Sequence, residues 1–279
     1  MIDGMWLIEA VVLGVVQGLT EFLPISSTAH LRVVPALLGW PDPGAAYSAA
    51  IQLGSIVAVI TYFFRDLMQL LTGSVTALKA RDFGNQDVRM AAAIVIGTIP
   101  ICVLGLILKP VLERPDSILR ALPVIGTASI VMGLLLLIAE RQGKHDRSIS
   151  SIAVRDGLII GLGQALALIP GCSRSGSTLT VAMLMHLKRE DAARFSFLLG
   201  VPAITLSGIV EVLHLVRGGL TEASLMSLVI GTATSTVVSY LAIAWLLKFL
   251  KEHSTTIFII YRLVFGIAII ALSTAAVIR

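Results

Sequence analysis

Six apolar segments, each about 20 residues long, dominate this 279-residue sequence. A helix of that length crosses a hydrocarbon core of ~30 Å. Charged residues make up only 14% of the chain, whereas soluble domains contain about 25%. Backbone groups in lipid must form their hydrogen bonds internally. We therefore expect an all-α polytopic membrane protein with a single membrane domain, residues 1–279, and full spans at 45–64, 89–108, 118–139, 192–216, 223–247 and 256–277.

Two further apolar regions, 5–38 and 153–187, are interrupted by polar residues. The first is broken around Pro24, and the second is broken between Pro170 and Thr178. Non-helical backbone at membrane depth is tolerated only where protein or water covers it. Each region is therefore predicted to form a re-entrant helix–loop–helix hairpin, which enters and leaves on the same side of the membrane.

The two broken regions resemble each other, which predicts an internal repeat. The segment Gly14-Val-Val-Gln-Gly-Leu19 matches Gly161-Leu-Gly-Gln-Ala-Leu166 at an offset of 147. Ser27 then matches Ser173 at an offset of 146, which implies a one-residue deletion between the two motifs. Chance similarity between helices rich in Gly and Leu is the alternative interpretation.

The repeat predicts the topology of the whole chain. Its halves are about 1–145 and 146–279, and each holds one hairpin and three full spans. Three spans make an odd number of crossings, so the second half must be inverted relative to the first. Inverted repeats with paired broken helices place their site where the two breaks meet.

Lys and Arg gather on one side of this predicted topology. Thirteen of them fall in four connecting segments and five on the opposite side; the four segments are 65–89, 140–155, 188–194 and 248–256. Cytoplasmic loops carry such an excess, which also explains the net charge of +4 without nucleic acid as a partner. Both termini and the first hairpin should then face outward, and the second hairpin should face the cytoplasm.

The first hairpin carries an acid, an imidazole and three adjacent hydroxyls. Gln17 and Glu21 lie four residues apart and so share a helix face. A lone carboxylate in lipid tends to protonate, but it stays ionised beside a cation. Phosphate chemistry often supplies that cation as Mg²⁺, held by one or two carboxylates and by substrate oxygens. A helix-cap network is the alternative role for this group, which continues through Ser26, Ser27, Thr28 and His30.

The second hairpin contains the segment Pro170-Gly-Cys-Ser-Arg-Ser-Gly-Ser-Thr178, which runs into an apolar helix. Backbone N–H groups at a helix N-terminus attract anions. Arg174 can grip phosphate with two parallel hydrogen bonds. The alternative is a serine-lined helix break whose Arg174 pairs with Glu21. Arg262, inside the last span, is a candidate second phosphate partner or a residue that snorkels to the cytoplasmic face.

These two motifs closely resemble the two signatures of the bacterial undecaprenyl-diphosphatase family, also called bacitracin-resistance proteins. The matching segments are Gln17-Gly-Leu-Thr-Glu-Phe-Leu-Pro-Ile-Ser-Ser-Thr-Ala-His30 and residues 170–178. The resemblance implies hydrolysis of undecaprenyl diphosphate to the monophosphate and inorganic phosphate, which recycles the carrier lipid of peptidoglycan synthesis and confers bacitracin resistance. It also implies a divalent metal, Mg²⁺ or Ca²⁺, and a multi-pass protein of the cytoplasmic (inner) membrane whose site opens to the periplasm.

The resemblance carries the family's motif residues onto Gln17, Glu21, His30, Ser173, Arg174 and Thr178, and the working hypothesis adds their neighbours. Metal binding falls on Glu21 and Gln17, although many family members have Glu at position 17. Catalysis falls on Glu21, His30, Ser27 and Arg174. The remaining substrate-binding candidates are Ser26, Thr28, Ser173, Ser175, Thr178 and Arg262.

The working mechanism leaves the nucleophile open between Ser27 and a water activated by His30, because an imidazole suits proton transfer near neutral pH. The partners expected are the polyprenyl diphosphate and membrane lipids, and a homodimer is left open. A flippase for the polyprenyl phosphate is the rival function, since inverted repeats are common in transporters.

Overall fold

Helices make up all the regular structure of the described residues. The computed structural model of the protein describes residues 7–112, 117–217, 221–275 and 277–278. Their only β-type pairing is an isolated bridge between Arg147 and Leu187, so the all-α prediction is confirmed for this part of the chain. The α-helices are α1 (Leu7–Phe22), α2 (Ser27–Leu38), α3 (Gly44–Tyr62), α4 (Phe64–Lys79), α5 (Gln86–Leu112), α6 (Leu122–Gln142), α7 (Val154–Ala165), α8 (Arg174–Leu184), α9 (Arg189–Arg217), α10 (Glu222–Glu252) and α11 (Thr256–Thr274), with 3₁₀ turns η1 (Ile118–Arg120), η2 (Ile149–Ser151) and η3 (Leu166–Leu168).

Most of the predicted spans are confirmed by long apolar helices. Within the described residues, α5, α6, α9, α10 and α11 are each long and apolar enough to cross a membrane. The predicted span at 45–64 is occupied by α3, which meets the same criterion only together with α4, across a bend of 70°. The described residues therefore hold five candidate spans, or six if the bent pair counts as one, and the chain is a multi-pass membrane protein.

The helix α4 corrects the prediction of a loop over residues 65–89. Arg65 and Asp66 interrupt the apolar run and hid the pattern that follows. On either side of them, large apolar side chains recur at helical spacing and are exposed: Phe64, Met68, Leu71, Val75 and Leu78. Such a helix, apolar along one face and charged elsewhere, is typical of the membrane interface.

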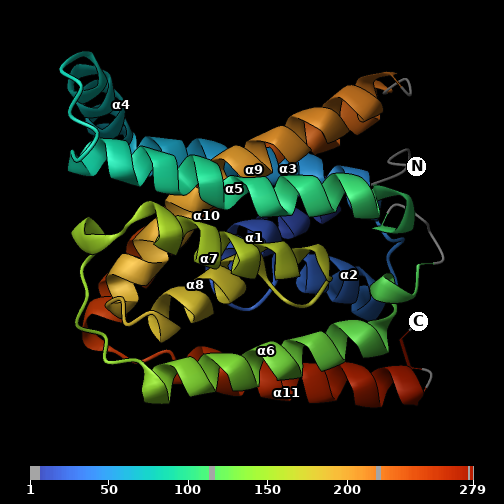
Figure 1. The fold of residues 1–279 in the computed structure, drawn as a ribbon. Helices are drawn as coiled ribbons and strands as arrows, with labels where there is room; N and C mark the ends of the chain where they lie inside the picture. Colours follow the sequence, from blue (N-terminus) through green and yellow to red (C-terminus); the bar gives the residue numbers. More distant parts are fainter. Residues whose placement is uncertain (1–6, 113–116, 218–220, 276, 279) are drawn as a thin grey trace.

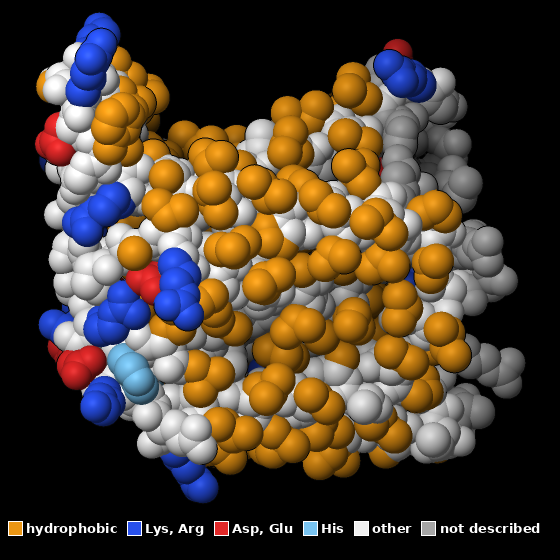
Figure 2. All heavy atoms as spheres, viewed as in Figure 1, with side chains coloured by type: hydrophobic (Ala, Val, Ile, Leu, Met, Phe, Trp, Pro, Cys, Tyr) orange, Lys and Arg blue, Asp and Glu red, His pale blue; other side chains and the backbone are white. Residues whose placement is uncertain are grey.

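The two broken regions lie between layers of long helices (Figure 1). In this view, α7 and α8 run between α5 above and α6 with α11 below, and α1 and α2 lie behind them. Charged side chains gather along the left edge of Figure 2, where α4 and the connection from α6 to α7 lie, and hydrophobic side chains cover most of the face between the two ends. The start of α1 and the end of α11 both lie at the opposite, right-hand end (Figure 1).

Glycines let the broken helices approach their neighbours closely. A Cβ atom at Gly14 of α1 would lie 2.6 Å from the carbonyl oxygen of Gly231 in α10. A Cβ atom at Gly161 of α7 would lie 2.6 Å from the Cα atom of Gly97 in α5. Contacts between small residues are common where membrane helices pack. Each broken helix is thus fixed against one long helix at a glycine crossing.

Candidate active site

The carboxylate of Glu21, near the end of α1, joins both broken regions. Its Oε1 atom accepts hydrogen bonds from Arg174 Nη2 at 2.7 Å and Gln52 Nε2 at 2.9 Å. Its Oε2 atom accepts from Ser27 Oγ at 2.7 Å and Gln17 Nε2 at 2.9 Å. The side chain is only 2% exposed. Four predicted site residues, Gln17, Glu21, Ser27 and Arg174, are therefore in direct contact, and α3 adds Gln52, which sequence analysis missed.

Both helices that follow the breaks begin in the same way. Ser26 precedes α2 with φ of 78°, and Ser173 precedes α8 with φ of 68°. Positive φ is uncommon for residues other than glycine and is often found at functional sites. Ser173 Oγ accepts a hydrogen bond from the Gly176 N–H at 3.1 Å, as an N-cap does. The two turns place Ser27 and Arg174, the first residues of α2 and α8, beside the same carboxylate.

Arg174 has more donors than the described protein atoms accept. Its Nε and Nη1 atoms are buried without a hydrogen-bond partner, and its side chain is only 9% exposed. Buried polar groups are almost always hydrogen-bonded, so each exception needs an explanation. A guanidinium presents two adjacent N–H groups to phosphate or carboxylate. The pairing with Glu21 therefore leaves Arg174 able to take an oxyanion as well.

Gly200 of α9 provides the space for Arg174. A Cβ atom there would lie 2.6 Å from Arg174 Cζ. Gly200→Ala should displace the guanidinium and lower activity by roughly a hundredfold, because small misplacements of a positioning group are costly. Steady-state kinetics with a thermal unfolding check would measure this.

Gly208→Ala is the matched control for that substitution. It lies on the same helix, and its Cβ atom would meet the side chain of Leu53, 2.8 Å from Cγ. It should alter packing and leave turnover within about threefold. Equal losses for both variants would remove the link between Gly200 and the position of Arg174.

His30 is held by groups on three sides. Its Nδ1 atom lies 2.7 Å from the Ser26 carbonyl oxygen, and its Nε2 atom lies 2.6 Å from the Tyr261 hydroxyl. Its ring stacks on Phe265 at 4.2 Å. A carbonyl only accepts, so Nδ1 donates to Ser26 O, and Nε2 shares a hydrogen bond with the Tyr261 hydroxyl. Both ring nitrogens of His30 are therefore occupied, and one of the partners is Tyr261, a residue that sequence analysis missed.

Arg262 takes neither of the roles expected for it. The side chain is fully buried, so it does not snorkel. Its Nη1 atom donates to Pro24 O at 2.9 Å, and its Nη2 atom donates to Gly171 O at 2.8 Å and Cys172 O at 3.1 Å. Its Nε atom donates to Ser129 O at 3.2 Å. Arg262 therefore ties the two breaks to each other and to α6, and these bonds use four of its five N–H groups.

The remaining predicted hydroxyls also hold the breaks in place. Ser175 Oγ donates to Leu23 O at 3.0 Å, across from one break to the other. Thr178 Oγ1 donates to Arg174 O at 2.8 Å and contacts the hydroxyl of Ser196. Their contacts are therefore structural, and they shape the turn that presents Arg174.

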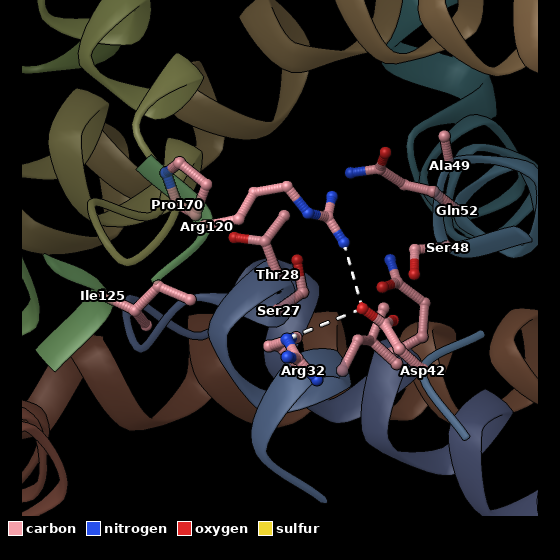
Figure 3. A pocket seen from close by; sticks show the side chains of 12 residues that line it. Ser27, Thr28, Arg32, Asp42, Ser48, Ala49, Gln52, Arg120, Ile125 and Pro170 are labelled. Atoms are coloured by element: carbon pink, nitrogen blue, oxygen red, sulfur yellow. Dashed lines mark hydrogen bonds and ion pairs between the residues drawn. The ribbon is translucent and has the colours of Figure 1, made fainter. Parts of the chain in front are cut away.

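A cavity of about 140 Å³ (Figure 3) is lined by residues that donate to Glu21, whereas Glu21 and Arg174 are not among its lining residues. Three predicted site residues line it, namely Gln17, Ser27 and Thr28. Gln52 and Ser48 of α3 form another part of the wall. The other lining residues are Leu31, Arg32, Asp42, Ala49, Arg120, Ile125 and Pro170. The cavity offers hydroxyls, amides and guanidinium groups, a set that suits a phosphorylated ligand.

Comparison with known proteins identifies the family. The family model described as "Bacitracin resistance protein BacA" matches residues 10–268. The chain is 57% identical over 267 residues to an undecaprenyl-diphosphatase of Gloeobacter violaceus, covering 96% of this chain and 92% of that protein. It is 56% identical over 265 residues to that of Synechococcus elongatus, covering 95% and 92%. The undecaprenyl-diphosphatase of Nostoc sp. is 52% identical over 279 residues, covering 100% and 87%. The chain belongs to the bacitracin resistance protein BacA family.

Proposed function

We propose that this protein hydrolyses undecaprenyl diphosphate to undecaprenyl phosphate and inorganic phosphate. The observation that carries the proposal is Arg174, whose buried Nε and Nη1 atoms lack a protein acceptor beside Glu21 and Ser27. The relatives from Gloeobacter violaceus and Synechococcus elongatus bear the name of that activity. Hydrolysis returns the carrier lipid to cell-wall synthesis and removes the diphosphate form, in keeping with the family's link to bacitracin resistance.

The hydrogen bond from Ser27 to Glu21 supports Ser27 as the nucleophile. Its Oγ atom lies 2.7 Å from Glu21 Oε2, so the carboxylate can take the hydroxyl proton as Oγ attacks the terminal phosphorus. The bond between phosphorus and the bridging oxygen breaks, and polyprenyl phosphate leaves. Water then releases inorganic phosphate from the phosphoserine. Arg174 stabilises the charge on the phosphoryl oxygens, where positioning and electrostatics supply most of the catalysis.

The donor set around Glu21 fits a divalent cation that is shared with the substrate. Among the described residues, no three His, Cys, Asp or Glu side chains gather to hold an ion. Gln17 and Gln52 donate to Glu21 through Nε2, and a bound ion would take their amide oxygens instead. With the carboxylate and the Ser27 hydroxyl, those oxygens would form a hard ligand set, and Mg²⁺ commonly takes its other ligands from substrate phosphates. We therefore propose that Glu21 and Gln17 hold Mg²⁺ or Ca²⁺, which would neutralise part of the diphosphate charge.

We also infer the inverted repeat and its two re-entrant hairpins. The positive-φ serines that precede α2 and α8, Ser26 and Ser173, support it. They keep the offset of 147 through both breaks, which corrects the match of Ser27 with Ser173 and the one-residue deletion expected from the sequence. The glycine crossings of α1 with α10 and of α7 with α5 support it too.

The proposed orientation has the pocket opening outward from the inner membrane. It opens near η1 and α2, away from the basic connections at the other end (Figure 1). Residues 113–116 and 218–220 of the expected outer loops, with Arg114 among them, lie outside the described residues, as does Arg279.

Phosphate release from a C15 or C55 prenyl diphosphate by the purified protein tests the proposed activity. We expect release of one phosphate per lipid, and a chelator should lower the rate. The transporter alternative predicts binding of the lipid without release. Binding without release at any metal concentration would therefore overturn the hydrolase proposal.

The substitution Gln17→Glu tests the metal assignment. A second carboxylate at this position should tighten the binding of a divalent ion, because ligand charge raises affinity. We expect the concentration of Mg²⁺ or Ca²⁺ needed for half-maximal rate to fall by about tenfold, with activity retained.

Gln164→Glu in α7 is the matched control. Gln164 is the glutamine that matches Gln17 in the repeat, and it is fully buried as well. This variant should leave the metal dependence unchanged. If both variants change the metal concentration for half-maximal rate equally, or if neither changes it, Gln17 is not a metal ligand.

A further inference from the structure

A second set of charged side chains lies at the mouth of the cavity. We define the mouth cluster as Arg32 of α2, Asp42 of the connection from α2 to α3, and Arg120 of η1. Asp42 Oδ2 lies 3.5 Å from Arg32 Nε and 3.3 Å from Arg120 Nη2. Figure 3 shows the carboxylate between the two guanidinium groups, with Ser27 and Thr28 behind them. Three separate chain segments therefore meet at the mouth through one carboxylate.

Two arginine–carboxylate contacts therefore lie at or near the cavity. The contact between Arg174 and Glu21 lies behind lining residues that donate to Glu21, and it is nearly inaccessible to water. The arginines of the mouth cluster are 26% exposed, and Asp42 is 33% exposed. An arginine donor that contacts a carboxylate can contact a phosphate oxygen instead. Asp42 is therefore placed to compete with any anion for Arg32 and Arg120.

The mouth cluster suits a small hydrated anion better than the lipid-linked phosphate. Its side chains reach water, whereas the prenyl chain must remain among apolar surfaces. The two arginines and one carboxylate carry a local charge of +1, which attracts phosphate weakly. Exposed charge pairs interact far less strongly than buried ones, so an anion held there exchanges readily with the solvent.

We propose that Arg32 and Arg120 form a second anion-binding site, which receives inorganic phosphate after it leaves Arg174. Asp42 competes for the same donors and so expels the ion to water. This inference rests on the proposed function, because phosphate is the product of that reaction. In this proposal, the mouth cluster clears the product from the cavity of about 140 Å³.

Product inhibition by added inorganic phosphate tests the proposal. Asp42→Asn removes the competitor, so the inhibition constant should fall by about tenfold. Arg120→Gln removes a donor, so the constant should rise by about tenfold. Arg120→Lys keeps the charge and should fall between Arg120→Gln and the unchanged protein. Arg65→Gln, at the exposed start of α4, removes the same charge elsewhere and should have no effect.

The opposite signs separate anion binding from a structural role. If the mouth cluster only tied its three segments together, both substitutions would weaken phosphate binding. Shifts in the same direction, or shifts no larger than that of Arg65→Gln, would overturn the proposal. If Arg120→Gln does not fold, Asp42→Asn and Arg120→Lys decide the outcome.

A thermal measurement separates this inference from the proposed hydrolysis. Phosphate that binds the folded protein raises its unfolding temperature, with no need for turnover. Phosphate should stabilise the Asp42→Asn variant most and the Arg120→Gln variant least, against chloride at equal ionic strength. That order would support the anion site even for a protein that released no phosphate from lipid. If the active protein did not show that order, the second anion site would be refuted and the proposed hydrolysis would stand.

Discussion

Glu21→Gln is expected to lower phosphate release by roughly 10³–10⁴-fold, because a positioned acid–base group contributes about that much. The substitution keeps the size of the side chain but removes the charge on which four donors converge. Ser27 then loses its proton acceptor, and the proposed metal loses its only carboxylate ligand. Initial rates measured across a range of Mg²⁺ concentrations would show a loss that added metal does not restore.

A charge-balanced double variant separates chemistry from stability. Glu21→Gln alone leaves Arg174 buried without its carboxylate, which costs about 3–5 kcal/mol when a buried pair is broken. Glu21→Gln combined with Arg174→Gln removes both charges and should recover much of the unfolding temperature. Activity should stay at the level of the weaker single variant. Recovery of activity along with stability would mean that Glu21 serves only as the partner of Arg174.

Arg262→Lys is expected to destabilise the protein by about 3–5 kcal/mol, since a buried charge loses much of its hydrogen bonding. An ammonium group has three donors on a single atom. It cannot reach carbonyls in both breaks and in α6 as the guanidinium does. The unfolding temperature in detergent should fall by at least about 5 °C, and activity should fall with it because the hairpins separate.

Arg155→Lys in α7 provides the matched control, because Arg155 is exposed. It should leave both the unfolding temperature and the rate unchanged. If Arg262→Lys lowers the rate at an unchanged unfolding temperature, Arg262 acts on the substrate. That result would restore the role of second phosphate partner, one of the two roles expected for this residue from its place in the last span.

The long helices could be predicted from the sequence because lipid imposes a length and a polarity on each span. The segments at 118–139 and 256–277 became α6 and α11 with bounds within four residues. The prediction was wrong at α4, where the rule for full spans does not apply. A helix along the interface needs only one apolar face, and its charged residues resemble a loop.

Site residues could be predicted from the sequence where a polar side chain interrupts an apolar region. Glu21, Ser27 and Arg174 are polar groups within apolar regions, and the structure brings them into contact. Gln52 lies within a span, and its polarity alone could have marked it. Tyr261 gave no such signal, because a tyrosine in a membrane helix is common at either interface. Its contact with His30 joins residues 231 positions apart, which no local pattern encodes.

The bonds of Arg262 also limit how the molecule can move. A carrier that exposes its site first to one side and then to the other must let its two halves separate at the breaks. Here one buried side chain holds the carbonyls of Pro24, Gly171 and Cys172 together. Separation would leave an unpaired charge in a low-dielectric interior. We therefore expect a site with a single opening, where the lipid headgroup enters and the phosphate leaves on the same face of the membrane. The protein would then act only on lipid in the leaflet that this opening meets.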